Sequence, residues 1–370
     1  MVDCKSVVQL TIGASSRIGA MLPSSVCGES VMAAMNFGAI VRSEQIAWRK
    51  RRLSNRERGW QNNRQYEHIL PRRDWELNLF PGIRSDGQVP LASYLNANKV
   101  KTHTGVHNLC SSWILCANMY FPFRSPNGKA LLAEFLKAKV SPEITAVDDI
   151  ELEYEVPDVR FKPGALLGEE SGQRGAGQTS PDVAFLVRTA RGEGLVLTES
   201  KFTEHSFYQC SGAKKERTGR LGNPDPSRCR SFALVADAPR KHCHLVKCER
   251  LYWDHLELTP SAATISSACP AATGAYQLFR QQALANALKA SGKWDLVVSA
   301  VAYDERNQAL FKVIGAGRNK ADVRASWTSI FGPGAAFTHF THQDWVAWVR
   351  SRGGSEWRAW LSWVKDRYTY

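Results

Sequence analysis

The strongest constraint on the fold lies between residues 181 and 201, which read PDVAFLVRTARGEGLVLTESK. Two apolar runs, 183–189 and 195–198, flank the short polar segment ARGEG with its two glycines. Runs of this length on either side of a glycine-containing turn indicate a β-hairpin. The hairpin carries a Pro-Asp pair before its first strand and Glu-Ser-Lys at the end of its second.

The charged ends of this hairpin are expected to share one face. Side chains alternate along a strand, so Glu199 and Lys201 point the same way. A turn closing around residues 192–193 puts Asp182 opposite Thr203. Asp182 then lies one diagonal step from Lys201, about 7–8 Å away in an ideal ladder. We expect the three ionic groups to meet on one side of the ribbon, at a spot open to solvent.

Two carboxylates that converge from neighbouring strands predict a site for a hard cation. Mg²⁺ takes one or two carboxylates together with waters and substrate phosphate. A bound cation polarises a phosphoryl oxygen and lowers the pKa of its water. A nearby lysine ammonium can orient that water and offset developing negative charge. Asp182, Glu199 and Lys201 therefore predict metal-assisted hydrolysis of a phosphodiester.

These residues resemble the PD-(D/E)xK, or restriction-endonuclease-like, nuclease superfamily. Pro181-Asp182 matches the first half of its motif and Glu199-Ser200-Lys201 the second. The order of expected elements agrees: a helix with Glu134, a strand at 148–156, the hairpin at 182–203, a helix at 274–290 and a strand at 294–303. The resemblance covers about residues 105–315 and implies an α/β fold with a restriction-endonuclease-like core, a mixed central sheet flanked by helices.

The resemblance also implies roles for individual residues. Asp182, Glu199 and Lys201 are the catalytic group, and Mg²⁺ or Mn²⁺ is held by Asp182, Glu199 and the backbone carbonyl of Ser200. The superfamily often adds a Glu from the first helix, and Glu134 is the match here, as a catalytic residue and metal ligand. Glu151, Glu153 and Glu155 on the next strand compete for that place. Gln281 is the expected polar residue of the later helix, with Gln277 and Arg280 as alternatives, and Glu204 is a further candidate contact.

The composition favours a polyanionic partner. Lys and Arg number 48 against 35 Asp and Glu, a formal net charge of +13, and such an excess suits nucleic acid first. Between residues 41 and 80 basic residues alternate with aromatic ones, which suits a phosphate-tracking surface with stacking platforms. Arg49, Lys50, Arg51 and Arg52 are its candidate nucleic-acid contacts. The alternative is a solvated helix with a few buried aromatics.

A cysteine-containing insertion separates the lysine strand from the second helix, over residues 205–270. Cys210, Cys229, Cys243 and Cys248 are candidate zinc ligands, because four soft ligands in a short span can bind zinc tetrahedrally. The superfamily resemblance adds an iron-sulfur cluster as a second candidate. No C-x₂-C pair is present, so buried, unligated thiols are the alternative.

Three parts are expected along the chain. Residues 1–104 form an N-terminal extension and basic arm, with a loosely ordered start up to about residue 40; 105–315 form the nuclease-like core with its insertion; and 316–370 form a Trp-rich helical segment. A further strand is expected at 309–315. Without a convincing secretory leader or an apolar window of about 18 residues, we expect a cytoplasmic protein with no membrane partner.

The leading hypothesis is a Mg²⁺-dependent nuclease that acts on DNA in preference to RNA, with attack at ends or interior undetermined. No base-reading motif is visible, so no sequence specificity is predicted. A catalytically inactive nuclease fold that binds nucleic acid or serves as a scaffold is the alternative. A hydrolase of phosphorylated small molecules is a third hypothesis, which predicts a small enclosed pocket.

Overall fold

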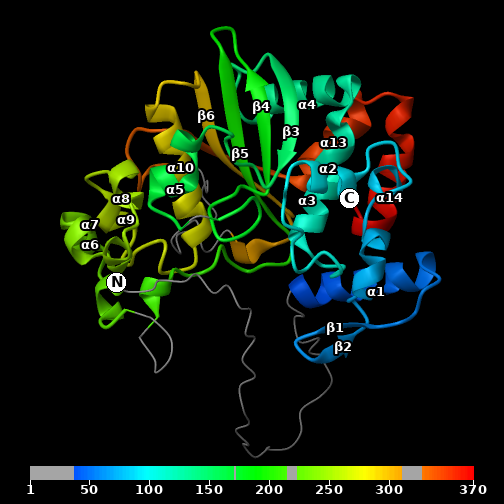
Figure 1. Ribbon diagram of the computed structural model, residues 1–370, viewed down its shortest axis with the longest axis horizontal. Helices are drawn as coiled ribbons and strands as arrows, with labels where there is room; N and C mark the ends of the chain where they lie inside the picture. Colours follow the sequence, from blue (N-terminus) through cyan, green and yellow to red (C-terminus); the bar gives the residue numbers. More distant parts are fainter. Residues whose placement is uncertain (1–36, 171, 215–222, 311–326) are drawn as a thin grey trace, which may run out of the picture.

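A mixed five-stranded sheet forms the centre of the computed structural model, which describes residues 37–170, 172–214, 223–310 and 327–370. The strand order is β3-β4-β5-β6-β7, antiparallel from β3 to β5 and parallel from β5 to β7 (Figure 1). The strands are β3 (Ala146–Leu152), β4 (Val183–Arg188), β5 (Glu193–Lys201), β6 (Leu296–Tyr303) and β7 (Ala336–Thr341). A separate small hairpin pairs β1 (Gly59–Gln61) with β2 (Arg64–Tyr66).

Helices cover both faces of this sheet (Figure 1). One side carries α1 (Phe37–Arg52), α2 (Leu91–Ala97), α3 (Ser112–Tyr120), α4 (Pro126–Lys139), α13 (His342–Arg352) and α14 (Arg358–Tyr368). The other carries α5 (Pro163–Leu167), α10 (Tyr276–Ala290) and the insertion, with α6 (Phe232–Asp237), α7 (Pro239–His242), α8 (Tyr252–His255) and α9 (Ala262–Ile265). The expected mixed central sheet flanked by helices is confirmed.

Local sequence accounts for the main elements. All eight residues of β6, LVVSAVAY, are buried, as expected for a strand covered by helices on both faces. Helix α4 begins after Ser125, whose side chain accepts a hydrogen bond from the Gly128 amide, and has Pro126 in its first turn. Helix α3 ends at Tyr120, before Pro122, as the sequence predicts. None of the described helices is long and apolar enough to span a bilayer.

The hairpin register differs from the predicted one. Arg188 pairs with Glu193 and Val183 with Thr198, so Asp182 comes level with Glu199 and the prediction that it faces Thr203 is wrong. The turn closes earlier because the Thr189 amide donates to the Gly192 carbonyl at 2.9 Å. The Thr189 hydroxyl also accepts from the Gly192 amide at 3.1 Å. This side-chain cap places the turn ahead of the glycine and brings the two acidic residues closer together.

Two other strands depart from expectation. The strand expected over 148–156 runs from Ala146 to Leu152, and it ends where Glu153 adopts a left-handed backbone with φ 48°. Such a conformation interrupts the extended backbone that a ladder requires. Strand β7, parallel to β6, was not expected. Residues 309 and 310 of the strand expected at 309–315 are helical, and the rest of that expected strand lies outside the described residues. The loosely ordered start expected up to about residue 40 lies outside them as far as residue 36, and residues 37–40 are the first turn of α1.

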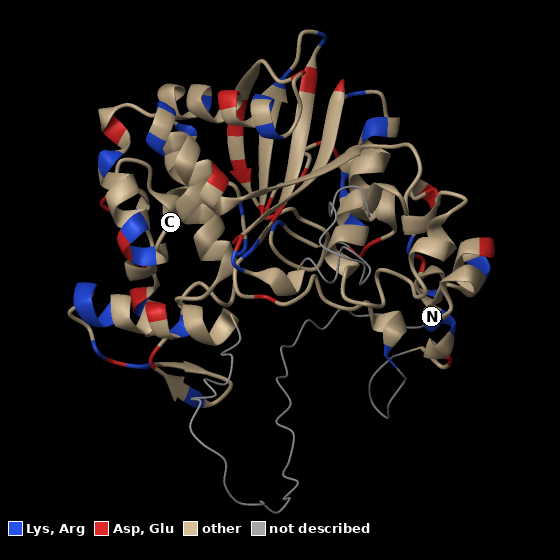
Figure 2. Cartoon of the chain, turned by 180° about the vertical axis from the view of Figure 1, so that it is seen from behind, with Lys and Arg blue, Asp and Glu red and all other residues tan. Residues whose placement is uncertain are grey.

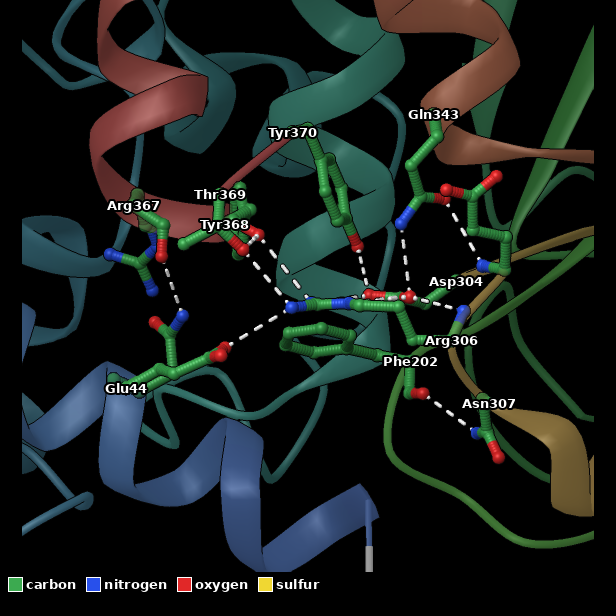
Figure 3. A network of polar contacts seen from close by, with 12 residues as sticks. Glu44, Phe202, Asp304, Arg306, Asn307, Gln343, Arg367, Tyr368, Thr369 and Tyr370 are labelled. Carbon is green, nitrogen blue, oxygen red and sulfur yellow. Dashed lines mark hydrogen bonds and ion pairs between the residues drawn. The ribbon is translucent and has the colours of Figure 1, made fainter.

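Both ends of the described chain pack into the core of the sheet. Val41 of α1 and Trp360 of α14 belong to the same hydrophobic cluster as Phe185 of β4. A polar network follows β6, where Asp304 accepts hydrogen bonds from Arg306 and from the C-terminal Tyr370 (Figure 3). These contacts tie the C-terminus to the end of the strand that pairs with β5.

Asn307, in the same network, fixes the segment that follows Lys201. Its side-chain amide donates to the backbone carbonyls of Phe202 and Glu204, both at 2.8 Å. The Asp304 amide donates to the Lys201 carbonyl at 3.3 Å. The end of β5 is therefore held from the neighbouring strand (Figure 3).

Candidate active site

The structure brings Asp182, Glu199 and Lys201 together at one end of the sheet. Asp182 directly precedes β4, and the other two residues end β5. The Ser200 amide donates to Asp182 Oδ2 at 2.8 Å. The Lys201 ammonium donates to Glu199 Oε1 at 2.7 Å. Because Asp182 lies level with Glu199, the two carboxylates are cross-strand neighbours on one face.

A third carboxylate, that of Glu153, adjoins this pair. The Glu153 amide donates to the Asp182 carbonyl at 3.0 Å, so the residue continues the β3–β4 pairing by one step beyond the strand. Its side chain is buried, and the charges of Asp182 and Glu199 act on it. Glu153 was among the competitors weighed from sequence. Its position at the end of the strand that pairs with Pro181-Asp182 is the feature of the sequence that could have distinguished Glu153 from the other candidates.

Glu134, the predicted helix acid, does not reach this group. Helix α4 buries Leu131, Leu132 and Phe135, whereas Glu134 is exposed. The helix therefore turns the Glu134 carboxylate toward solvent, away from the sheet. Helical spacing alone placed this residue at the edge of the apolar stripe, and the packed helix puts it outside.

Glu204 lies close to the site, as its position just past Lys201 indicated. One carboxylate oxygen accepts from the Phe202 amide at 2.9 Å, and the other accepts from the Ser112 hydroxyl at the start of α3. Its charge is among those that raise the pKa of Lys201. Glu204 thus adds a fourth carboxyl group near the site, already held by two hydrogen bonds.

The pKa values of the site follow from burial and from crowded negative charge. Burial, and then the charge of Glu199, hold the pKa of Asp182 well above its usual range. Burial and the charges of Asp182 and Glu199 do the same for the pKa of Glu153. For Lys201, burial lowers the pKa, but the charges of Glu199, Glu204 and Asp182 outweigh it and the net pKa is raised. Lys201 is therefore cationic, and the carboxylates outnumber it.

Access to the site is narrower than expected. Asp182 is half-buried, but Glu199 is 5% exposed and Lys201 only 3%. The expectation of a spot open to solvent is wrong for these two residues. Lys201 Nζ lies 5.6 Å from the ring centroids of Phe207 and Tyr208, which begin the insertion. The insertion therefore covers the lysine, and Tyr208, 42% exposed, forms the outer surface there.

The later helix, α10, supplies polar residues on the same side of the sheet. Gln281 is buried, and its amide donates to the Ser299 hydroxyl and the Ala300 carbonyl of β6, both at 3.0 Å. These bonds fix the helix on the strand. Arg280 donates to the buried carboxylate of Glu169 at 3.2 Å. The charges of Arg280 and Glu199 also attract each other.

The four predicted nucleic-acid contacts in α1 differ in their surroundings. Arg49 is 3% exposed and donates to backbone carbonyls, including those of Glu67 and Ile69, so it is not available to phosphates. The side chains of Lys50, Arg51 and Arg52 are more than half exposed, and each forms a salt bridge with a carboxylate, either Glu67 or Asp366.

The predicted cysteine group is only partly brought together. Cys210, Cys229 and Cys243 line one small cavity in the insertion, but Cys248 does not line it. Cys269, just before α10, takes its place. Cys269 also lies in the insertion, but no ligand spacing marks it in the sequence.

The donor set at Asp182 and Glu199 fits a hard divalent cation. Both residues present carboxylate oxygens from neighbouring strands, and burial together with the charge of Glu199 raises the pKa of Asp182. Within the described part of the chain, no three His, Cys, Asp or Glu side chains are spaced to hold a metal ion. A Mg²⁺ ion bound by two carboxylates takes its remaining ligands from water and substrate phosphate. The pair is therefore compatible with such a site.

Comparison with known proteins identifies the family of the chain. A family model described as "Restriction Endonuclease associating with ARP" (REase-ARP) matches residues 42–369. The chain belongs to this family. The REase-ARP match runs from α1 into the end of α14 and so includes the basic arm, the sheet, the insertion and the C-terminal helices. Membership in the REase-ARP family confirms the restriction-endonuclease resemblance and indicates nuclease activity. No curated protein and no solved structure matches the chain.

Proposed function

We propose that this protein is a Mg²⁺-dependent nuclease that hydrolyses phosphodiester bonds of DNA. The observation that carries the proposal is the pairing of Asp182 with Glu199 across two strands, with Lys201 on the second carboxylate. REase-ARP membership supports the nuclease class, and the net charge of +13 supports a nucleic-acid partner.

Asp182, Glu199 and the backbone carbonyl of Ser200 would hold the cation, with Glu153 beside them. A bound Mg²⁺ supplies Lewis-acid polarisation of a phosphoryl oxygen and a water of lowered pKa. Asp182 is already oriented by the Ser200 amide, and Glu199 by the Lys201 ammonium. Preorientation of this kind reduces the reorganisation needed when the charged substrate arrives.

Lys201 acts as a cation that positions the attacking water and stabilises negative charge on the phosphate. Its raised pKa keeps it protonated, so it does not act as a general base at neutral pH. It can donate hydrogen bonds to the attacking water and to a phosphate oxygen while it still contacts Glu199. The half-buried Asp182 is the more accessible member, so the substrate phosphate would approach from its side.

One observation favours the alternative, an inactive nuclease fold that binds nucleic acid. Glu199 and Lys201 form a buried ion pair under Phe207 and Tyr208, and a buried pair can serve structure alone. In that case the carboxylates would hold no cation.

A cleavage assay separates the two readings. Supercoiled plasmid, linear duplex, single-stranded DNA and RNA are incubated with the purified protein in Mg²⁺, Mn²⁺ or EDTA. We expect metal-dependent cleavage of DNA, reduced at least about 100-fold in Glu199→Gln and in Lys201→Met. Glu134→Gln, which changes an exposed carboxyl on α4, is the matched control and should cleave normally. Equal cleavage by wild type and both site variants would place the centre elsewhere, and no cleavage of any substrate would favour the inactive fold.

A further inference from the structure

The insertion contains a second group of ligand-type residues, separate from the carboxylate site. We propose that Cys210, Cys229, Cys243 and Cys269 bind a four-thiolate metal centre, either zinc or an iron-sulfur cluster. The four residues line one small cavity on the α10 side of the sheet. They come from segments far apart in sequence, and the last of them leads into α10. The inference is independent of the nuclease proposal.

Amide groups surround the sulfurs of this cluster. Burial raises the pKa of the Cys210, Cys243 and Cys269 thiols, and the backbone amides two and three residues further along the chain partly offset that rise. The fourth sulfur, that of Cys229, has the Asn223 amide nitrogen at 4.0 Å, and its thiol donates to the Gly212 carbonyl at 3.4 Å. A neutral thiol is a weak acceptor, whereas a metal-bound thiolate carries the charge that such donors stabilise. Amides close to the sulfurs of one group would stabilise thiolates once a metal has displaced the thiol protons.

The backbone builds this geometry in the same way three times. Cys210, Cys243 and Cys269 each begin a tight turn in which their own carbonyl accepts from the amide three residues later, at 3.1, 3.3 and 2.9 Å. Cys229 is held next to Cys269, because the Cys269 amide donates to the Cys229 carbonyl at 2.9 Å. Turns repeated at three cysteines and a direct bond to the fourth keep the sulfurs around one cavity.

The rest of the lining suits a soft ligand set. It includes Val235, Leu245, Trp253 and Phe279 but no carboxylate. Four sulfurs without oxygen ligands select zinc or iron-sulfur chemistry over Mg²⁺ or Ca²⁺. The described cysteines are not spaced for a single ion as they stand, so binding zinc would draw the sulfurs inward to about 2.3 Å from the metal. Each thiol that forms a metal–sulfur bond releases its proton to solvent.

Metal analysis of the untagged full-length protein, purified without oxygen or chelator, tests the proposal. Zinc and iron are measured by inductively coupled plasma mass spectrometry, together with acid-labile sulfide and the visible absorption spectrum. About one zinc per chain, or several irons with matching sulfide and a brown colour, supports the centre and identifies it. Less than about a tenth of a metal equivalent per chain would overturn it.

Two substitutions test the ligand set. Cys269→Ser should lose the metal, whereas Cys110→Ser, a half-buried thiol outside the insertion, should keep it. Circular dichroism shows whether Cys269→Ser still folds, and titration of the wild type with an organomercurial should release the metal as thiols react. Full metal content in Cys269→Ser, or loss of metal in Cys248→Ser with Cys269→Ser unaffected, would contradict the assignment.

Discussion

Asp182, Glu199 and Glu153 place three carboxylates at one end of the sheet, with Lys201 bonded to one of them. Burial disfavours the ionised forms of Asp182 and Glu153, and the neighbouring negative charges add to this effect, so the pKa values of both residues rise. A fold under no other constraint would replace at least one of these acids by a neutral residue. The crowding is therefore the residue-scale argument for a cation-binding role.

The variant Glu153→Gln is predicted to be more stable than the wild type at pH 8 in EDTA. The raised pKa of Glu153 means that ionising it costs stability, and the cost grows as pH rises from the ordinary carboxyl pKa through the raised one. The amide cannot ionise, so we expect a gain of about 1 kcal/mol, a rise in Tm of roughly 2 °C. The gain should vanish below about pH 4, where both states of the wild type are protonated.

Calorimetry or a thermal-shift assay measures this difference. Glu134→Gln, on the solvent side of α4, is the control and should leave Tm unchanged. A Glu153→Gln protein that melts below the wild type at pH 8 would show that the carboxylate is stabilised in place and is not crowded.

Metal binding is predicted to release protons and to weaken as pH falls from 8 to 6. The cation needs Asp182 ionised, and the raised pKa of Asp182 shifts that ionisation to higher pH. Affinity for Mn²⁺ should change by up to about tenfold per pH unit for each proton released. Isothermal titration calorimetry in two buffers of different ionisation enthalpy gives the proton count. An affinity that is flat across this range would mean that the ligands are ionised before the metal arrives.

The chain that leads to Asp182 is tied to α10 by a buried polar network at Glu169 and Thr179. Glu169 accepts from the Thr179 amide at 2.5 Å and from the Tyr252 hydroxyl at 2.8 Å, and Arg280 pairs with the same carboxylate. Thr179, a member of this network, lies two residues before Pro181. The network therefore fixes the backbone just before β4 begins.

Arg280→Met is predicted to destabilise the protein by about 3–5 kcal/mol, because it leaves Glu169 buried without a cation. The double variant Glu169→Gln with Arg280→Met should recover much of this loss, since no uncompensated charge remains. Urea unfolding of the single and double variants measures both effects. A double variant no more stable than Arg280→Met would argue against the ion pair as the source of the coupling.

The elements were predictable from sequence where periodicity and breakers agree. Helix α10, strand β6 and the hairpin follow from apolar spacing and from glycine or proline boundaries. The register was not predictable, because a threonine side chain rather than the glycine pair fixes the turn. A local backbone detail also determines which glutamate joins Asp182 and Glu199. Glu153 itself adopts the left-handed conformation just after β3, and no spacing rule indicates this. Cys269 became visible only through tertiary contacts between distant segments.

At the scale of the whole molecule, positive charge is spread over many elements rather than gathered on one. Figure 2 shows Lys and Arg on α1 and on the C-terminal helices, interleaved with Asp and Glu. In α1, Arg49 is buried and its basic neighbours form salt bridges. A net charge of +13 distributed in this way favours contact with the phosphate backbone over readout of bases.

DNA affinity is therefore predicted to be salt-dependent and nearly independent of sequence. In EDTA, where no cleavage occurs, affinity for duplex DNA should fall at least about tenfold between 50 and 200 mM salt. If α1 contacts DNA, Arg51→Ala should reduce the slope of log affinity against log salt by about 0.9. Arg191→Ala, at the hairpin turn far from the site end of β5, is the matched control. Affinity that does not respond to salt would exclude a backbone-tracking surface.

The most direct test of the central claim is the position of a bound Mn²⁺ ion in crystals of the full-length protein, located by its anomalous scattering. The account predicts a peak within coordination distance of one carboxylate oxygen each of Asp182 and Glu199, with Lys201 still beside Glu199. A manganese peak at other carboxylates, or crystals soaked in Mn²⁺ with no peak between these two residues, would contradict it.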